Sequence, residues 1–453
     1  MTDTSLAPET PETSTAKGSL TQIDARTRRR RAAETRFRLY GLTAVAIGVV
    51  FLLILVTSIV NNGVGAFQQT FITAQVYLDP AKVDKNGNRD PEEMKKVSTF
   101  GYAPLVENAI LAEVAARGID TPLVKPGDMK NLLSASAPAQ VRDYVLANPD
   151  RLGETVAFRL LASSRVDGYM KERVFREDVA RDKNISVEQL DLTDALAEAG
   201  VIAKGFNSAF IFGADASGSR PEQAGMGVAM IGSFFMMLVV LVLSLPIGVA
   251  ASIYLEEFAP KNRLTDLIEV NISNLAAVPS IVFGILGLAA FIQFAHLPQS
   301  APLVGGLVLT LMTLPTIIIS TRASLKAVPP SIRDAALGVG ASKMQSVFHH
   351  VLPLAMPGIL TGTIIGLAQA LGETAPLLLI GMVGYVATNY PDGISAGFLD
   401  PNSAMPAQIY EWARRSDPAF YERAWGGIII LLVFLLTMNI IAILLRRRFE
   451  HRW

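Results

Sequence analysis

The chain has 453 residues, 51% of them hydrophobic and 18% charged, with a mean hydropathy of +0.37. Soluble chains usually carry about a quarter charged residues, so this composition argues against a soluble class and for an integral membrane protein. The 40 basic residues balance the 40 acidic ones, so net charge says nothing about a partner, and the absence of cysteine excludes disulfides, thiolate metal sites and a cysteine nucleophile.

Residues 1–38 are rich in Thr, Pro, Ser and Arg, which predicts a disordered basic tail on the cytoplasmic side. An arginine-rich run lies directly before the first apolar segment. In that place it is typical of a topology anchor and lipid contact rather than of nucleic-acid binding. About 20 apolar residues follow, which predicts an uncleaved transmembrane helix at 39–60 instead of a removable signal peptide.

Residues 61–225 separate the first two apolar segments and carry mixed signals of secondary structure. Apolar residues at helical spacing cover 105–117, and Ser186 with Gln189 forms a capping box that opens another helix. An Asn-Gly pair after a short strand at 76–78 indicates a turn. We therefore expect a small inserted α+β domain.

Five further apolar segments lie in residues 226–445, each long enough to cross about 30 Å of hydrocarbon at about 1.5 Å per residue. They are 227–255, 268–291, 303–320, 358–383 and 425–445, and residues 446–453 form a short basic tail. The predicted fold class is therefore an all-α polytopic membrane protein with six transmembrane helices and the inserted α+β domain.

The distribution of Lys and Arg near the span ends predicts the orientation. With the N-terminus in the cytoplasm, the cytoplasmic connections hold 18 basic residues and the short outer connections hold three. Both termini are therefore expected in the cytoplasm. An even number of spans then places 61–225 in the periplasm.

The connection at 321–355 carries the strongest local pattern. Ser331 is expected to cap a short helix that ends near Gly340, and Ser342 to cap a second helix that Pro353 stops. The first helix presents the small side chains of two alanines, so a partner backbone can approach it closely. An ordinary amphipathic surface helix is the alternative reading.

This stretch resembles the EAA loop of ABC importer permeases, with Asp in place of the usual Glu. In that family the loop is the coupling helix, which seats in a cleft of the ATPase subunit. The resemblance assigns ATPase docking to Arg333, Asp334, Ala335, Ala336, Gly340, Leu352 and Pro353.

Three further segments, at 251–257, 278–287 and 371–378, resemble one family of these permeases, the PstA family of bacterial phosphate importers. The last one, Leu-Gly-Glu-Thr-Ala-Pro-Leu-Leu, separates phosphate permeases from other EAA permeases. The resemblance covers 226–445 closely, and the insert resembles an extra N-terminal region of one subset. It implies a type I importer with a second permease (PstC-like), an ATPase dimer (PstB-like) and a periplasmic phosphate-binding protein (PstS-like).

Glu373 is the one ionisable residue of the fifth apolar segment, where a carboxylate is costly unless it is paired or faces water. It is predicted to line the translocation pathway together with Thr374 and Gln369; a structural carboxylate paired with a neighbouring helix is the alternative. Relatives often have arginine at the position of Gln369, and Glu at that of Arg322. Because Gln369 stands in place of that arginine, the segment lacks an internal Arg–Glu pair. Glu373 would therefore pair with an arginine of the partner permease, or accept a hydrogen bond from hydrogen phosphate.

The predicted function is inward transport of inorganic phosphate across the inner membrane, in contact with lipid and without nucleic acid. Four histidines without an HExxH motif and the lack of a Gly-Lys dipeptide argue against an enzyme. No cofactor is expected on this chain, and ATP and Mg would bind the partner ATPase. The alternatives are a permease for another oxyanion (sulfate, molybdate or phosphonate) and a membrane sensor with a periplasmic ligand domain.

Overall fold

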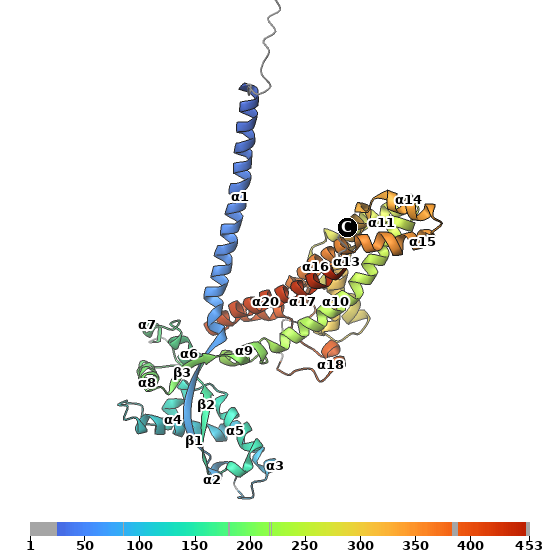
Figure 1. Cartoon of the computed structure of the whole chain (residues 1–453). Coiled ribbons are helices and arrows are strands. Elements are labelled where there is room, and N and C mark those ends of the chain that lie inside the picture. Colours follow the sequence, from blue (N-terminus) through green and yellow to red (C-terminus); the bar gives the residue numbers. More distant parts are fainter. Residues whose placement is uncertain are drawn as a thin grey trace, which may run out of the picture. The chain divides into compact units, whose positions relative to one another are not determined.

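The computed structural model describes residues 25–84, 86–179, 182–216, 218, 220–382 and 388–449. The chain divides into two compact units, residues 1–58 and 59–453, which are described separately below. The fold is predominantly helical, and the described strands form one small sheet within the second unit (Figure 1).

The described residues of the first unit form a single long helix. It is the main part of α1 (Ala25–Gly63), and every described side chain of this helix as far as Thr57 is exposed. The helix already includes 25–38, so the prediction of disorder is wrong for these residues. Arg, Ala and Glu have high helix propensity, and the run continues directly into the apolar segment. Residues 1–24 lie outside the described residues.

The insert is a two-layer α+β domain, as predicted. Its antiparallel sheet has the order β2-β1-β3, from β1 (Gln68–Tyr77), β2 (Thr155–Leu161) and β3 (Ile202–Phe206). Alternate side chains of β1, namely Ile72, Ala74 and Val76, are buried against helices, while the side chains between them are exposed. One face of the sheet therefore carries the domain core.

The helices of the insert begin and end at residues with matching chemistry. α4 (Ala103–Ala116) ends before Gly118, which has a φ of +63°, and the predicted capping box of Ser186 and Gln189 opens α8 (Val187–Glu198). The other helices are α2 (Pro80–Val83), α3 (Pro91–Met94), α5 (Ala137–Ala147), α6 (Ser164–Met170), α7 (Arg176–Val179) and α9 (Ser208–Phe212).

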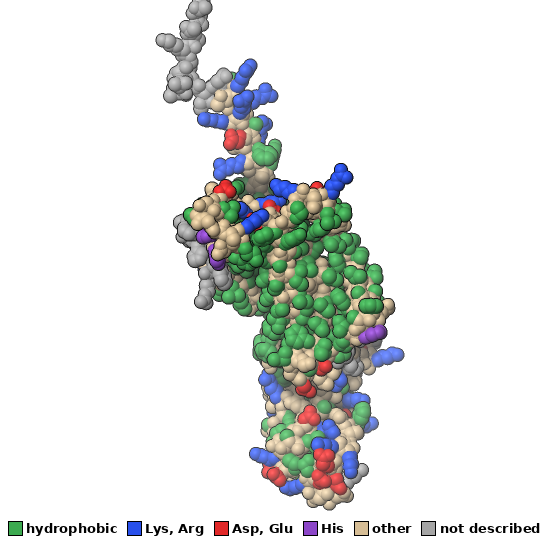
Figure 2. All heavy atoms as spheres, turned by 90° about the vertical axis from the view of Figure 1, so that its right-hand side faces the viewer, with side chains coloured by type: hydrophobic (Ala, Val, Ile, Leu, Met, Phe, Trp, Pro, Cys, Tyr) green, Lys and Arg blue, Asp and Glu red, His purple; other side chains and the backbone are tan. Residues whose placement is uncertain are grey.

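Four long helices form the body of the membrane part: α10 (Gly227–Ile253), α13 (Pro302–Ala327), α16 (Leu352–Gly372) and α20 (Pro418–Phe449). α13 packs between α10 and α16. Glycines of α16 face serines of α13 so closely that a Cβ atom has no room, at Gly358 against Ser324 and at Gly362 against Ser320. On the outside, Figure 2 shows a broad hydrophobic zone with charged side chains gathered beyond its two ends.

By length and composition, five of the described helices can cross a membrane, or six if one bent pair counts as a single span. That pair corrects the third predicted span, 268–291. α11 (Arg263–Ala276) and α12 (Ser280–Gly287), which continues to Phe294, meet at 100°. Pro279 causes the break because it donates no backbone hydrogen bond and disfavours helical geometry at Val278.

The helix that was predicted to stop at Pro353 does not stop there. α15 (Lys343–Ser346), a π-helical turn (Val347–Val351) and α16 form one continuous helix up to Gly372. The π-helical turn shifts the hydrogen-bond pattern just before Pro353, so the missing N–H of this proline leaves the helix intact. The remaining helices are α14 (Pro330–Gly338), α17 (Ala375–Leu379), α18 (Ile394–Leu399) and α19 (Met405–Arg414).

Candidate functional site

The loop between α13 and α16 folds as a short helix, α14, followed by a glycine turn. The helix begins at Pro330, so Ser331 lies inside its first turn and does not cap it, contrary to the prediction. Proline fits this first position because its fixed φ is helical and its missing N–H has no partner there anyway. Gly340 has a φ of +87° and ends the helix, and Ser342 caps α15 as predicted.

The two predicted alanines of α14 differ in exposure. Ala335 and the neighbouring Asp334 are exposed, whereas Ala336 is 6% exposed and packs within the chain. The outward surface continues with apolar side chains, because Leu337 is 48% exposed and Val339 is 85% exposed. This surface of small and apolar residues is available to another protein.

Arg333 points inward from α14, away from that surface. Its Nη2 lies 2.6 Å from Oε1 of Glu257, and its Nε lies 3.1 Å from the same oxygen. It also donates to the carbonyl oxygens of Leu325 (3.0 Å) and Val328 (2.9 Å) near the end of α13. Arg333 therefore holds α14 to α13 and to η6 (Tyr254–Phe258), the π-helical turn that follows α10.

Arg322, the second departure from the family pattern, also lies in an ion cluster at this end of the helices. It binds Glu269 of α11 at 2.6 Å and Glu256 of η6 at 3.4 Å. Beside these groups, a hollow of about 900 Å³ opens between the end of α13 and the start of α16. Its lining includes Pro353 and the exposed His349 and His350, while Leu352 is half-buried.

Glu373 lies at a break in the fifth span instead of inside a regular helix. α16 ends at Gly372, the backbone of Glu373 is extended (ψ 128°), and α17 starts after Thr374. Pro376 packs so closely on Gly284 of α12 that a Cβ atom there has no room. The side chain of Glu373 is half-buried, and none of the described residues binds its carboxylate.

Gln369 lies one helical turn before Glu373 and is exposed, and Thr374 is half-buried. Among the residues that the structure describes, neither side chain forms a hydrogen bond to the carboxylate. The structure thus brings the three predicted pathway residues to one break in the helix, where the carboxylate of Glu373 has no partner among the described residues.

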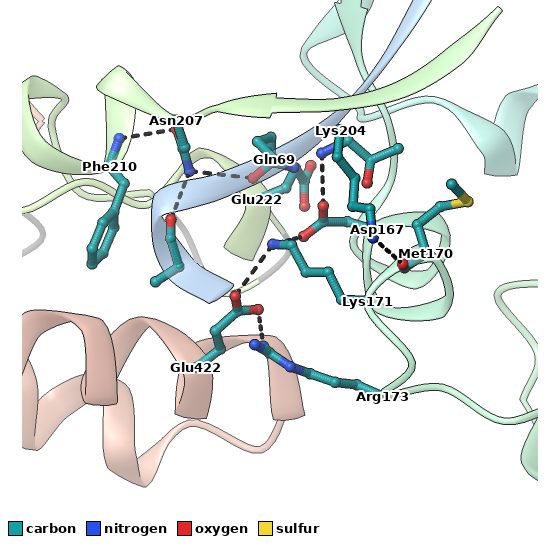
Figure 3. Close-up of polar contacts among 12 residues, drawn as sticks. Gln69, Asp167, Met170, Lys171, Arg173, Lys204, Asn207, Phe210, Glu222 and Glu422 are labelled. Atoms are coloured by element: carbon teal, nitrogen blue, oxygen red, sulfur yellow. Dashed lines mark hydrogen bonds and ion pairs between the residues drawn. The ribbon is translucent and has the colours of Figure 1, made fainter. Parts of the chain in front are cut away.

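A second polar cluster joins the insert to the membrane part (Figure 3). We call it the junction cluster, and it comprises Asp167, Lys171, Arg173, Glu222, Glu422 and Arg423. Buried Lys171 lies 2.6 Å from Asp167 of α6 and 3.2 Å from Glu422 of α20, and Arg173 pairs with the other oxygen of Glu422. The insert is therefore ion-paired to the start of the last span.

Arg423, the next residue of α20, is fully buried and reaches three segments of the chain. It donates to Ala66 O at 3.1 Å, to Oε1 of Gln69 at 2.6 Å and to Glu222 O at 3.1 Å. The carboxylate of Glu222 accepts a hydrogen bond from Ser134, and burial raises the pKa of Glu222 above its ordinary value. The junction cluster thus gathers both ends of the insert around α20.

Profiles of two protein families match the chain. Residues 245–453 match the family described as "Binding-protein-dependent transport system inner membrane component", and residues 24–179 match a domain of unknown function, DUF3333. The loop with α14 and the break at Glu373 lie in the first match, and most of the insert lies in the second.

Several relatives carry the name "Phosphate transport system permease protein", among them two mycobacterial proteins. PstA 1 of Mycobacterium tuberculosis is 31% identical over 232 residues, which is 51% of this chain and 73% of that protein. PstA of Mycobacterium leprae is 32% identical over 248 residues, 53% of this chain and 78% of that protein. This chain belongs to the PstA family. It is therefore an ABC importer permease subunit, a multi-pass protein of the inner membrane, and not an enzyme.

Solved structures align more weakly. The inward-facing MetNI methionine ABC transporter is 14% identical, with 49% of this chain and 92% of that chain aligned at a TM-score of 0.37. At this level the alignment transfers no structural detail to the PstA-family chain.

Sequence reasoning missed the partners of several charged residues. Glu257 precedes Arg333 by 76 positions, and Arg423 of the junction cluster binds the carbonyl oxygen of Ala66, which lies 357 positions earlier. One signal was present, because opposite charges at Glu256–Glu257 and at Arg322 lie at the ends of two spans predicted to face the same side. Nothing comparable marked Asp167 or Lys171 as partners of Glu422.

Proposed function

We propose that this chain is the permease subunit that moves inorganic phosphate inward across the inner membrane. The observation that carries the proposal is its identity of 31–32% with proteins named as phosphate transport permeases, over about three quarters of their length. The segment around Glu373, which resembles phosphate permeases most specifically, supports the same substrate.

The chain would work in a complex with a PstC-like second permease, a PstB-like ATPase dimer and a PstS-like phosphate-binding protein. ATP and Mg would bind the ATPase, and no cofactor is assigned to this chain. The exposed surface of α14, with Asp334, Ala335, Leu337 and Val339, supports docking of the ATPase there. Apolar and small residues on an exposed helix are typical of a protein contact.

The orientation is proposed with both termini in the cytoplasm and residues 61–225 in the periplasm. The excess of Lys and Arg in the connections assigned to the cytoplasm supports it. In this orientation α14 faces the cytoplasm, where ATP is available, and the insert faces the side from which phosphate arrives.

Glu373 is proposed to line the pathway at the break between α16 and α17. Its carboxylate has no partner among the described residues, and a lone carboxylate in a span needs a counter-charge or water. An arginine of the second permease would neutralise it and hold a gate closed. Alternatively, it would accept a hydrogen bond from the proton of hydrogen phosphate, a proton that sulfate lacks at neutral pH.

Uptake by the reconstituted complex tests the substrate. Vesicles that contain the four kinds of subunit should accumulate radiolabelled phosphate only when ATP is present on the side of the membrane where the ATPase lies. A large excess of unlabelled phosphate should abolish accumulation of the label, and equal amounts of sulfate, molybdate or a phosphonate should not. Competition by one of these other anions at the strength of phosphate would assign the permease to that anion instead.

A further inference from the structure

Two adjacent carboxylates in η6, at the end of α10, reach different helices. Glu257 binds Arg333 of α14, whereas Glu256 lies 3.4 Å from Arg322 and 3.6 Å from Lys326, both in α13. Consecutive residues can diverge in this way because they lie about 100° apart around a helix axis. The end of α10 is thus ion-paired to both neighbouring elements.

The connection between α13 and α14 is not helical. Val328 and Pro329 have extended backbones (ψ 125° and 136°), so α14 is joined to the end of α13 by a bend without continuous backbone hydrogen bonds. Arg333 crosses this bend, because its guanidinium binds the carbonyl oxygens of Leu325 and Val328 on one side and Glu257 on the other. This contact ties α14 to the end of α13 and to η6, in addition to the packing of α14 on the π-helical turn Val347–Val351.

Glu257 is well suited to fix that contact. Its side chain is 7% exposed, and both of its oxygens accept hydrogen bonds from Arg333. A guanidinium that binds a carboxylate with two nitrogens has a defined orientation as well as a defined position. Loss of Arg333 leaves the buried carboxylate of Glu257 unpaired, and loss of Glu257 leaves the half-buried Arg333 without a counter-charge.

We infer that Glu257 is a positioning residue that, through Arg333, transmits displacement of α14 to α10. The inference rests on the proposed docking of the ATPase on α14. The outer surface of α14 would meet the ATPase, while Arg333 on its inner side would carry the movement to the end of α10. Arg333, which the family resemblance assigns to docking, thereby takes a role inside the permease.

The test compares Glu257→Gln with Glu256→Gln in the assembled, reconstituted complex. Both changes remove one carboxylate from the same turn, but only Glu257 contacts α14. We expect Glu257→Gln to lower the phosphate transported per ATP hydrolysed by about tenfold, because the buried pair is broken. Glu256→Gln should stay within about twofold of the wild type, because its contacts with Arg322 and Lys326 are long (3.4 and 3.6 Å) and Arg322 keeps Glu269 as a partner at 2.6 Å. Equal loss in both variants, or no loss in Glu257→Gln, would overturn the inference.

A double-mutant cycle separates this pathway from a general loss of stability. In an Arg333→Gln background, Glu257→Gln should cause less than about a twofold further change, since the contact is already gone. A further tenfold drop would mean that Glu257 acts without Arg333. If Glu257→Gln assembles poorly, Arg333→Lys keeps the charge but not the fork of donors, and it should give an intermediate ratio of transport to hydrolysis.

Backbone amide exchange in residues 329–341 tests the inference without any transported substrate. Exchange in this segment should be faster in Glu257→Gln than in the wild-type complex, and unchanged in Glu256→Gln. If the wild-type complex does not accumulate phosphate, the proposed substrate is wrong, and the exchange result still decides the role of Glu257. Wild-type exchange in Glu257→Gln would refute the positioning role.

Discussion

Glu373 carries a negative charge at a break in a span that is proposed to pass an anion. Replacement by Gln keeps the shape and the hydrogen-bonding capacity but removes the charge. If an arginine of the second permease is its partner, breaking the pair costs roughly 3–5 kcal/mol, enough to shift a two-state gate strongly. We therefore expect Glu373→Gln to reduce phosphate uptake per assembled complex and to raise ATP hydrolysis without substrate.

The matched control for this prediction is Asp400→Asn, an exposed carboxylate at the end of α18, which should transport like the wild type. Uptake must be divided by the amount of intact complex recovered from each preparation. A normal value per complex in Glu373→Gln, together with less complex, would assign Glu373 to helix association and remove it from the pathway.

The raised pKa of Glu222 predicts how stability depends on pH. A carboxyl whose pKa is raised in the folded chain holds its proton more tightly there than in the unfolded chain. Its contribution to stability is full below the ordinary pKa and is lost as the pH rises through the raised value. Glu222→Gln cannot ionise, and its amide oxygen can still accept the hydrogen bond from Ser134.

We therefore expect Glu222→Gln to match or exceed the unfolding temperature of the wild type at neutral pH. Its advantage should disappear on acidification towards the ordinary pKa of a glutamate. Glu198→Gln, on the exposed surface of α8, is the control and should reproduce the wild-type profile. The predicted sign of the pH dependence is wrong if the unfolding temperature of Glu222→Gln, relative to the wild type, is lower at neutral pH than at acidic pH.

At the level of elements, the exposed surface of α14 predicts where an ATPase binds. Leu337→Glu places a charge on this surface and should prevent copurification of the ATPase, while the permease still reaches the membrane. Val124→Glu introduces the same change on the exposed surface of the insert and should leave the ATPase attached. If both variants retain the ATPase equally, α14 does not dock it. Ala336→Glu is less informative, because Ala336 is packed inside the chain.

Hydropathy, together with capping residues and glycines at the helix ends, predicted most of the elements of this fold. The apolar runs, the capping residues Ser186 and Ser342 and the glycines after α4 and α14 are local features, and each one lies where the sequence indicates. The directions of helices α11 and α12 were harder to predict, because a hydropathy window reads the residues on the two sides of Pro279 as one continuous span. Pro279 marks the place of the break, but the 100° angle is a relation between two helices, and the contacts of α12 with α13 and α17 lie outside any local window.

The candidate site was predictable in its residues but not in their contacts. Asp334 and Ala335 are exposed in the way that a docking surface requires, and Glu373 lies at a break that Gly372 and Pro376 mark in the sequence. By contrast, the inward direction of Arg333 is set by Glu257, which is far away along the chain. Long-range ion pairs of this kind require the tertiary arrangement.

For the whole molecule, the orientation can be tested directly. A reporter enzyme that is active only in the cytoplasm should be active when it is fused after Arg448. A reporter that is active only in the periplasm should be active when it is inserted at Gly127. Gly127 is suitable because a side chain added there meets no other group. A fusion after Arg448 that is active only in the periplasm would overturn the span count.

The junction cluster has a consequence for how such chains can be shortened or recombined. Removing the insert by joining the end of α1 to the start of α10 would strip Glu422 and Arg423 of Lys171, Arg173 and Gln69 at once. Glu422 and Arg423 would then remain at the start of α20 without the residues of the insert that bind them. The insert and the start of α20 must therefore be exchanged together, and a working chimaera that lacks the insert needs uncharged residues at both positions.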